Sequence, residues 1–136
     1  MKINTPISVG ELVDKLTILE IKSAMIKDEG KLKDVSNERN ELNKKIADLT
    51  NPTLGFNFSV SQLFALKADL HEINLGLWKI EDQIRECERN KDFGAKFIRL
   101  ARDVYYTNDE RFEIKNRINQ LTSSNIKEVK SYESYS

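Results

Sequence analysis

The most regular hydrophobic pattern in the chain lies between residues 61 and 90. Apolar side chains recur there at alternating spacings of three and four positions, without an exception. They are Leu63, Leu66, Leu70, Ile73, Leu77, Ile80, Ile84 and Cys87. This spacing predicts one long helix with an apolar stripe of the coiled-coil type. Because about 30 residues of helix span roughly 45 Å, we expect this helix to project beyond a compact bundle or to be covered by a second chain.

Residues 31–50 carry a second, narrower apolar stripe with the same spacing. It consists of Leu32, Val35, Leu42, Ile46 and Leu49, and Arg39 occupies the one apolar position that is missing. We expect the two helices to form a long antiparallel, coiled-coil-like hairpin over about residues 31–90, because each stripe needs a partner and the connection is short. The uncharged connection, 51–60, is interpreted as a loop whose aromatic side chains fold back onto the bundle.

Capping patterns locate the other helices. Ser8 and Glu11 have the S-x-x-E spacing of a capping box, which predicts the start of a first helix. Gly30 is expected to end that helix, because glycine tolerates the left-handed backbone of a C-terminal cap. Thr107 and Glu110 repeat the capping pattern inside the last helical stretch, so we predict a break or kink there.

The expected fold is an all-α helical bundle of four or five helices, with one domain over 1–122 and a polar, mostly mobile tail over 123–136. The first and third helices carry apolar side chains on two faces, which is typical of a helix at the centre of a bundle or of a dimer. We therefore expect a homodimer. The second apolar face of the third helix supplies the expected partner interface, which comprises Phe64, His71, Leu75 and Trp78.

Composition narrows the range of partners. The 136 residues include 22 basic and 22 acidic side chains, so the chain lacks the basic surplus with which nucleic-acid-binding proteins displace phosphate counterions. No stretch approaches the roughly 18–20 consecutive apolar residues of a membrane-spanning helix. The single cysteine cannot form an intramolecular disulfide, which fits the reducing cytoplasm. We expect a cytoplasmic protein that binds neither nucleic acid nor membrane.

The residues that commonly carry out catalysis are scarce. The chain has one histidine, His71, and one cysteine, Cys87. On one continuous helix they lie roughly 24 Å apart along the axis, too far for a catalytic dyad. Together they also fall short of the three or four ligands of a zinc site. We assign no catalytic residue and no cofactor, and an enzyme is less favoured than a binding protein.

Two pairs of carboxylates offer the alternative of a metal-dependent enzyme. Glu38 and Glu41 lie one turn apart on the second helix, and Asp69 and Glu72 lie one turn apart on the third. All-α nucleotide pyrophosphohydrolases hold magnesium between such pairs on facing helices. The second pair here has the reverse order of the pattern in those enzymes. Glu38 and Glu41 also fit a solvated rim beside the apolar stripe.

A further set of polar residues borders the apolar stripes of the first, third and fourth helical segments. The set comprises Asp14, Lys15, Glu81, Asp82, Arg85, Asn108, Asp109 and Arg111. Arg111 takes a position that the helical spacing would give to an apolar side chain, and a buried guanidinium needs a carboxylate or carbonyl partner. Two interpretations stay open: salt bridges that fix the register of the helices, or a polar pocket for a small anionic ligand.

Three stretches resemble a small family of helical proteins found in bacteria and phages, about as long as this chain and with no assigned function. They are PISVGELVDKLTILEIK (6–22), INLGLWKIEDQIRECE (73–88) and DFGAKFIRLARDVYYTNDERFEIKNRINQL (92–121). The resemblance covers nearly the whole chain and is weakest over 31–60 and the tail. It implies an all-helical fold and transfers no catalytic residue or ligand. The leading functional hypothesis is a non-enzymatic assembly or adaptor module that acts through protein–protein interaction.

Overall fold

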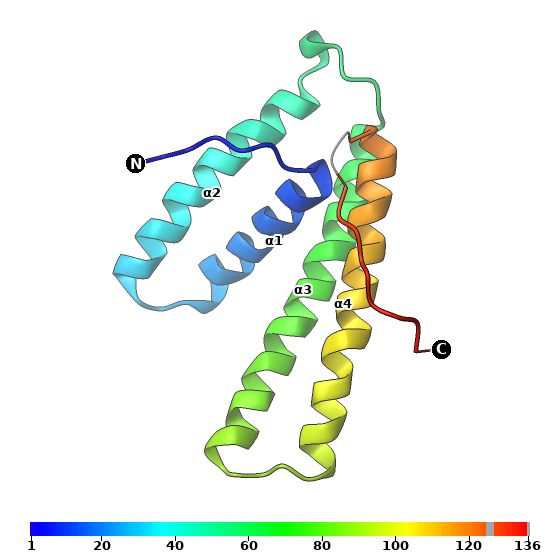
Figure 1. Ribbon diagram of the computed structural model, residues 1–136. Helices are drawn as coiled ribbons and strands as arrows, with labels where there is room; N and C mark the ends of the chain where they lie inside the picture. Colours follow the sequence, from blue (N-terminus) through cyan, green and yellow to red (C-terminus); the bar gives the residue numbers. More distant parts are fainter. Residues whose placement is uncertain (125–126, 136) are drawn as a thin grey trace.

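The computed structural model describes residues 1–124 and 127–135. These residues form four α-helices and one short 3-10 helix, with no strand among them (Figure 1). The α-helices are α1 (Val9–Met25), α2 (Glu29–Thr50), α3 (Val60–Arg89) and α4 (Ala95–Thr122), and the 3-10 helix η1 (Pro52–Leu54) follows α2. The all-α fold class predicted from the sequence is confirmed.

The helix ends agree with the sequence prediction at one capping site and differ from it at two others. The Ser8 hydroxyl accepts a hydrogen bond from the Glu11 N–H at 3.0 Å, as the capping box predicts. Gly30 does not end α1: the carboxylate of Asp28 caps α2 by accepting from the Lys31 N–H at 2.9 Å, which places Gly30 in the first turn of α2.

The predicted break at Thr107 is also wrong, because α4 is continuous from Ala95 to Thr122. Its buried side chains Leu100, Ile114 and Ile118 follow one face on both sides of Thr107. Packing of that face stabilises an uninterrupted helix, and the capping pattern at Thr107 has no free helix end to satisfy. The bundle therefore has four α-helices in the described part of the chain, within the expected range.

The helices pair differently from the predicted hairpin. α3 and α4 form the long antiparallel pair and share the most extensive contact in the molecule, whereas α2 has its main contact with α1 (Figure 1). α1 lies between α2 and the α3/α4 pair and contacts all three. The prediction fails because α2 packs against α1, whereas α3 packs against both α1 and α4.

The hydrophobic core lies where α1 crosses α3 and α4. Its buried members come from all four helices and are Leu12, Val13, Leu16, Ile46, Leu63, Leu70, Ile114 and Ile118. In the connection between α2 and α3, Phe58 packs against this core, as predicted for the loop aromatics, but Phe56 is 52% exposed. On the α3/α4 pair, this core therefore lies at the end formed by the N-terminal half of α3 and the C-terminal half of α4.

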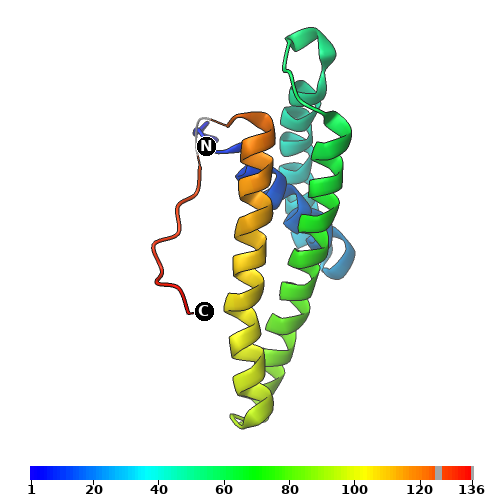
Figure 2. The same ribbon diagram turned by 90° about the vertical axis from the view of Figure 1, so that its right-hand side faces the viewer.

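The C-terminal segment runs alongside α4 (Figure 2). Residues 127–135 of it are described, whereas 125–126 and 136, which the sequence also assigned to the tail, lie outside the described residues. Lys130 of this segment contacts Asp109 of α4 with 2.5 Å between Nζ and Oδ1. The segment is therefore placed against the helix by specific contacts.

Gly10 makes a close contact on which the position of α1 depends. Its N–H donates to the Asn119 side-chain oxygen at 2.7 Å, and a Cβ at Gly10 would lie 2.6 Å from the Lys115 carbonyl oxygen. We predict that Gly10→Ala lowers the free energy of unfolding by about 1–3 kcal/mol, because the added methyl group must separate α1 from α4. Urea denaturation measures this change.

Gly76 of α3 is the matched control for this substitution. A Cβ at Gly76 meets no atom within 4 Å. Gly76→Ala should therefore raise the free energy of unfolding by about 0.5–1 kcal/mol, because alanine loses less backbone entropy in a helix. Equal effects of the two substitutions would contradict the close approach at Gly10.

Candidate functional site

A fully buried carboxylate, that of Asp14, lies in the N-terminal half of α1. The Arg111 guanidinium of α4 binds it with two groups: Nε donates to Oδ1 at 2.9 Å, and Nη2 donates to Oδ2. Asn74 of α3 also donates to Asp14 Oδ1, from Nδ2 at 2.9 Å. Two-point contacts between arginine and carboxylate are among the stronger side-chain interactions. This cluster joins α1, α3 and α4 at a single point.

Thr17 completes the contact between α1 and α3. Its hydroxyl donates to the Asp14 backbone carbonyl at 2.8 Å and accepts a second hydrogen bond from Asn74 Nδ2 at 2.9 Å. Both hydrogens of the Asn74 amide are therefore used on α1. Since Thr17 and Asn74 are buried, these hydrogen bonds satisfy polar groups that are excluded from water.

Lys115 of α4 lies beside this cluster with only 6% of its side chain exposed. Its ammonium is 2.8 Å from Glu11 Oε2 and 2.8 Å from Glu128 Oε2, and 4.0 Å from Asp14 Oδ2. Burial by itself lowers the pKa of Lys115, but the hydrogen bonds to Glu11 and Glu128 outweigh it, so the pKa lies above its usual value. The hydrogen bond to Asp14 likewise raises the pKa of Arg111.

A cleft of about 620 Å³ opens next to the cluster, between the C-terminal half of α1 and the α3/α4 pair. Its polar lining consists of Asn74, Glu81, Asp82, Arg85, Asn108 and Arg111, and its apolar lining of Ile18, Ile21, Leu77, Trp78 and Val104. Arg111 stands on the wall of this cleft, with 28% of its side chain exposed, whereas Asp14 behind it is fully buried. Arg111 therefore borders the cleft while Asp14 is shielded from it, and Arg111 also lines a second, smaller pocket with Lys115 and Glu128.

The structure brings together five of the eight polar residues that the sequence suggested. Glu81, Asp82, Arg85, Asn108 and Arg111 line the cleft. Asp14 lies behind its wall. Lys15 is exposed outside the cleft, and Asp109 faces the C-terminal segment. The two open interpretations are both represented in the geometry, because Asp14 and Arg111 form an inter-helix ion pair that also borders a cavity.

Sequence reasoning missed Asn74, Thr17 and Lys115. Asn74 directly follows Ile73 of the α3 stripe, and Lys115 directly follows Ile114 of α4. A polar residue next to a stripe position lies at the edge of the buried face. This position in the sequence is a signal for a polar group near the core. By itself it does not distinguish a buried polar side chain from a solvated one.

The chain matches, over residues 1–135, the sequence model of a family described as "Family of unknown function (DUF6165)". The chain belongs to this family. The resemblance to a family without an assigned function is thereby confirmed, while an origin in bacteria or phages stays a prediction. No curated protein and no solved structure shows a significant match.

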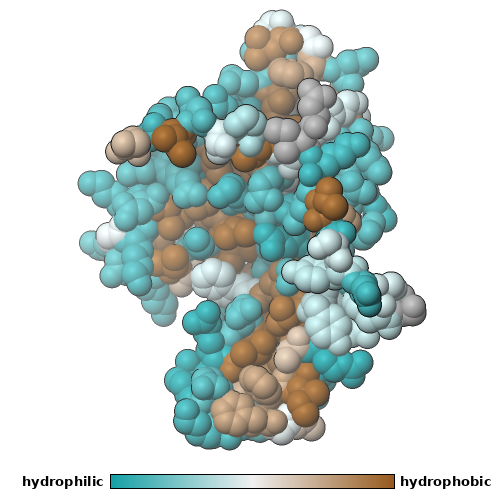
Figure 3. Space-filling model, viewed as in Figure 1, coloured by the Kyte–Doolittle hydropathy of each residue, from teal (hydrophilic) through white to brown (hydrophobic). Residues whose placement is uncertain are grey.

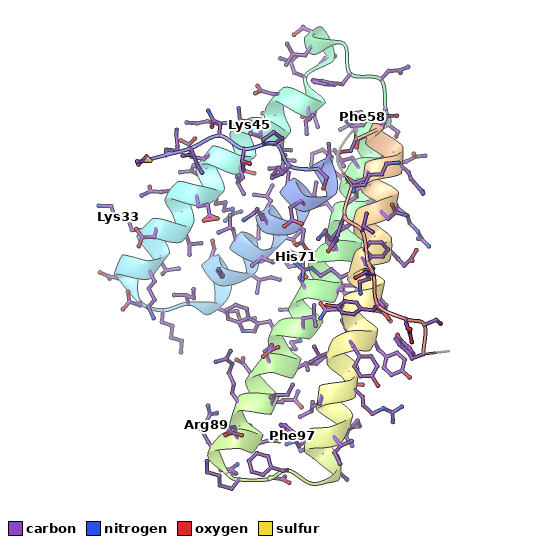
Figure 4. All side chains as sticks on the ribbon, in the orientation of Figure 1. Lys33, Lys45, Phe58, His71, Arg89 and Phe97 are labelled. Atoms are coloured by element: carbon purple, nitrogen blue, oxygen red, sulfur yellow. The ribbon has the colours of Figure 1, made fainter. Side chains whose placement is uncertain are left out.

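The other residues singled out in this DUF6165 protein lie on α2 and α3. Of the predicted partner interface, Phe64 is 45% exposed, while His71 (Figure 4), Leu75 and Trp78 are half-buried along α3. The carboxylates of the metal-site alternative are exposed: Glu38, Glu41, Asp69 and Glu72.

Neither a metal site nor a membrane span is found among the residues described. Residues 1–124 and 127–135 contain no group of three or more His, Cys, Asp or Glu side chains placed to hold a metal ion. Within the same residues, no helix combines the length and the apolar character needed to cross a membrane.

The C-terminal segment packs on the side of α4 that carries Asp109. The Tyr135 hydroxyl donates to Asp109 Oδ2, and the Tyr135 ring lies 5.3 Å and 5.0 Å from the rings of Tyr105 and Tyr106. Hydrogen bonds from Lys130 and Tyr135 lower the pKa of Asp109, and the bond to Asp109 raises the pKa of Tyr135 to about 12.

We predict that Asp14→Ala lowers the free energy of unfolding by about 3–5 kcal/mol, because it leaves the half-buried Arg111 guanidinium without its partner. The control is Glu81→Ala on α3, which removes an exposed ion pair with 4.0 Å between Arg85 Nε and Glu81 Oε2. That loss should be at most about 0.5 kcal/mol. Denaturant unfolding of both variants measures the difference, and similar losses would contradict the role of the buried pair.

The pKa of Tyr135 gives a second prediction. A tyrosine whose pKa is raised by a hydrogen bond keeps that bond below the ordinary pKa of 10 and loses it as the pH rises toward 12. The absorbance of tyrosinate, followed against pH in the native chain and in Tyr135→Phe, should differ by one component that titrates near 12. A difference component near 10 would contradict the contact with Asp109.

Proposed function

We propose that this protein is a non-enzymatic assembly module that associates with a second copy of itself through the tip of the α3/α4 hairpin. The tip surface consists of residues 81–103, that is, the last turns of α3, the connection, and the first turns of α4. It lies beyond the ends of α1 and α2 (Figure 1). The observation that carries the proposal is the scarcity of buried side chains in this part of the fold.

Within residues 81–103, only Cys87 and Leu100 are buried. Phe93 and Ile98 are 50% and 56% exposed, and Phe97 is half-buried at the tip (Figure 4). Hydrophobic side chains continue along this part of the hairpin below α1 in the space-filling view (Figure 3). Two helices with so small a core are stabilised when a partner covers them, because each fully buried large apolar side chain contributes about 1.5–3 kcal/mol.

Charge favours a second copy as that partner. The α3 part of the tip, 81–89, has four acidic and two basic side chains, and the α4 part, 95–103, has three basic and one acidic. A twofold axis across the tip places α3 of one copy against α4 of the other, so unlike charges meet on both sides. The resulting arrangement is a four-helix bundle of the common antiparallel kind.

The tip surface exposes two large apolar side chains, Phe93 and Ile98, whereas the α3 stripe that the sequence suggested exposes one, Phe64. Leu75, His71 and Trp78 of that stripe are already half-covered by the chain itself. Phe64 is the exposed member of the stripe. It supports the alternative that the dimer interface lies on the α3 stripe. Substitution of Phe64 therefore distinguishes the two surfaces.

Analytical ultracentrifugation at micromolar concentrations tests the proposal. The native chain should sediment at twice its mass of 15.8 kDa. Ala101 is exposed, four residues after Phe97 and three before Val104, hence on the same face of α4. Ala101→Glu should weaken dimerisation by at least about tenfold, because a carboxylate would be desolvated in the interface. Dimerisation should also weaken at high salt.

Ala65→Glu is the matched control, since Ala65 is an exposed alanine on α3 outside the tip surface. It should leave dimerisation unchanged. Phe64→Glu should also leave it unchanged. A native chain that stays monomeric contradicts self-association, and a dimer that is broken by Phe64→Glu but not by Ala101→Glu contradicts the location at the tip.

A further inference from the structure

We propose that the cleft beside Arg111 binds a small molecule that joins a flat aromatic body to an anionic group, in the way that a nucleoside monophosphate does. The cleft lies between α1 and the α3/α4 pair, and it shares Glu81, Asp82 and Arg85 with the edge of the tip surface. Its volume of about 620 Å³ falls in the range of about 300–1,000 Å³ that is typical of pockets for small organic ligands.

Arg111 supplies a preorganised anion contact. Its Nε and Nη2 are held by the buried Asp14 carboxylate, which fixes the plane of the guanidinium. Nη1 is the nitrogen that Asp14 does not engage, and the side chain borders the cleft. Asn108, one turn earlier on α4, lines the same wall. A guanidinium fixed in this way binds a phosphate or carboxylate oxygen without losing further side-chain freedom.

Arg85 on α3 supplies a second, adjustable cation. It is largely exposed and is only loosely paired with Glu81, at 4.0 Å between Nε and Oε2, so it can turn toward an anion in the cleft. Glu81 and Asp82 line the cleft as hydrogen-bond acceptors. Because these carboxylates would repel a bare anion, the lining favours a ligand that also carries hydroxyl or amino groups as donors.

The apolar side of the cleft fits the body of such a ligand. Trp78 lines the cleft together with Leu77, Ile18, Ile21 and Val104. Its indole ring is the group on which the aromatic part of the proposed ligand would stack. An aromatic ring, hydroxyl donors and a phosphate occur together in a nucleoside monophosphate. The combination of one aromatic face, acceptors and two guanidinium groups therefore points to this class of ligand.

Trp78 is also the only tryptophan of the chain, so its fluorescence reports directly on the cleft. We expect adenosine 5′-monophosphate to change this fluorescence in a saturable way. Adenosine alone and inorganic phosphate alone should each bind at least about tenfold more weakly, because each contacts one part of the lining. No saturable change at millimolar nucleotide, or equally strong binding of phosphate alone, would overturn the proposal.

Two exposed arginines one turn apart on α3 provide a matched pair of variants. Arg85→Gln should weaken binding of the nucleotide by about tenfold, through loss of a charge-assisted hydrogen bond, and should leave binding of adenosine unchanged. Arg89 is exposed and does not line the cleft (Figure 4), so Arg89→Gln should have no effect on either. Equal losses in the two variants would mean that only the general charge of α3 attracts the nucleotide, which overturns the proposal.

Arg111→Lys tests the fixed guanidinium. Lysine keeps the positive charge beside Asp14 but lacks the further N–H groups with which the guanidinium can bind a second anion. Nucleotide binding should therefore weaken while adenosine binding persists. Unchanged nucleotide binding would overturn the role of Arg111. The inference does not depend on dimerisation. The Ala101→Glu variant should bind the nucleotide as the native chain does, so a failure of self-association and a failure of ligand binding are separate results.

Discussion

The burial of the Asp14 carboxylate is the constraint on which the arrangement of the helices depends. A carboxylate removed from water is destabilising unless charge and hydrogen-bond partners surround it. Those partners come from two other helices, Asn74 of α3 and Arg111 of α4. α1 can therefore lie only at the height and rotation at which Asp14 reaches both. Gly10, one turn earlier, adds a second condition, since its N–H reaches Asn119 only when α1 approaches α4 closely.

The position of α1 in turn determines which surfaces stay open. α1 has 17 residues, whereas α3 has 30 and α4 has 28. A helix of that length, held at Asp14, covers only one half of the α3/α4 pair (Figures 1 and 2). The cleft beside Arg111 lies at the border of the covered half, and the tip surface begins at this border and extends away from α1. Both proposals therefore follow from one mismatch in helix length.

The sequence predicts the elements well and their partners poorly, for a physical reason. The apolar stripe of residues 63–87 identifies α3, because helical periodicity is a local property. The stripe does not determine which helix packs against it, because any apolar helix face can cover it. The predicted pairing of α2 with α3 was wrong for this reason. Capping patterns share this weakness: the pattern at Thr107 is present, but core packing on both sides keeps α4 intact. The polar cluster was partly predictable, because Arg111 occupies an apolar position of the helical spacing.

The contacts around Asp14 also separate two roles that a buried ion pair can have. Register between α1 and α3 is already fixed by neutral groups, because Asn74 bonds Thr17 and the Thr17 hydroxyl bonds the backbone. Register between α1 and α4 is fixed by the hydrogen bond from Gly10 to Asn119. The contact between Arg111 and Asp14 holds α1 in the same position as these neutral hydrogen bonds do. What the pair adds is a guanidinium held rigidly at the wall of a cleft, with its partner sealed behind it. That geometry supports a role in binding, because a guanidinium already held in place at a cavity wall loses little further side-chain freedom when it binds an anion.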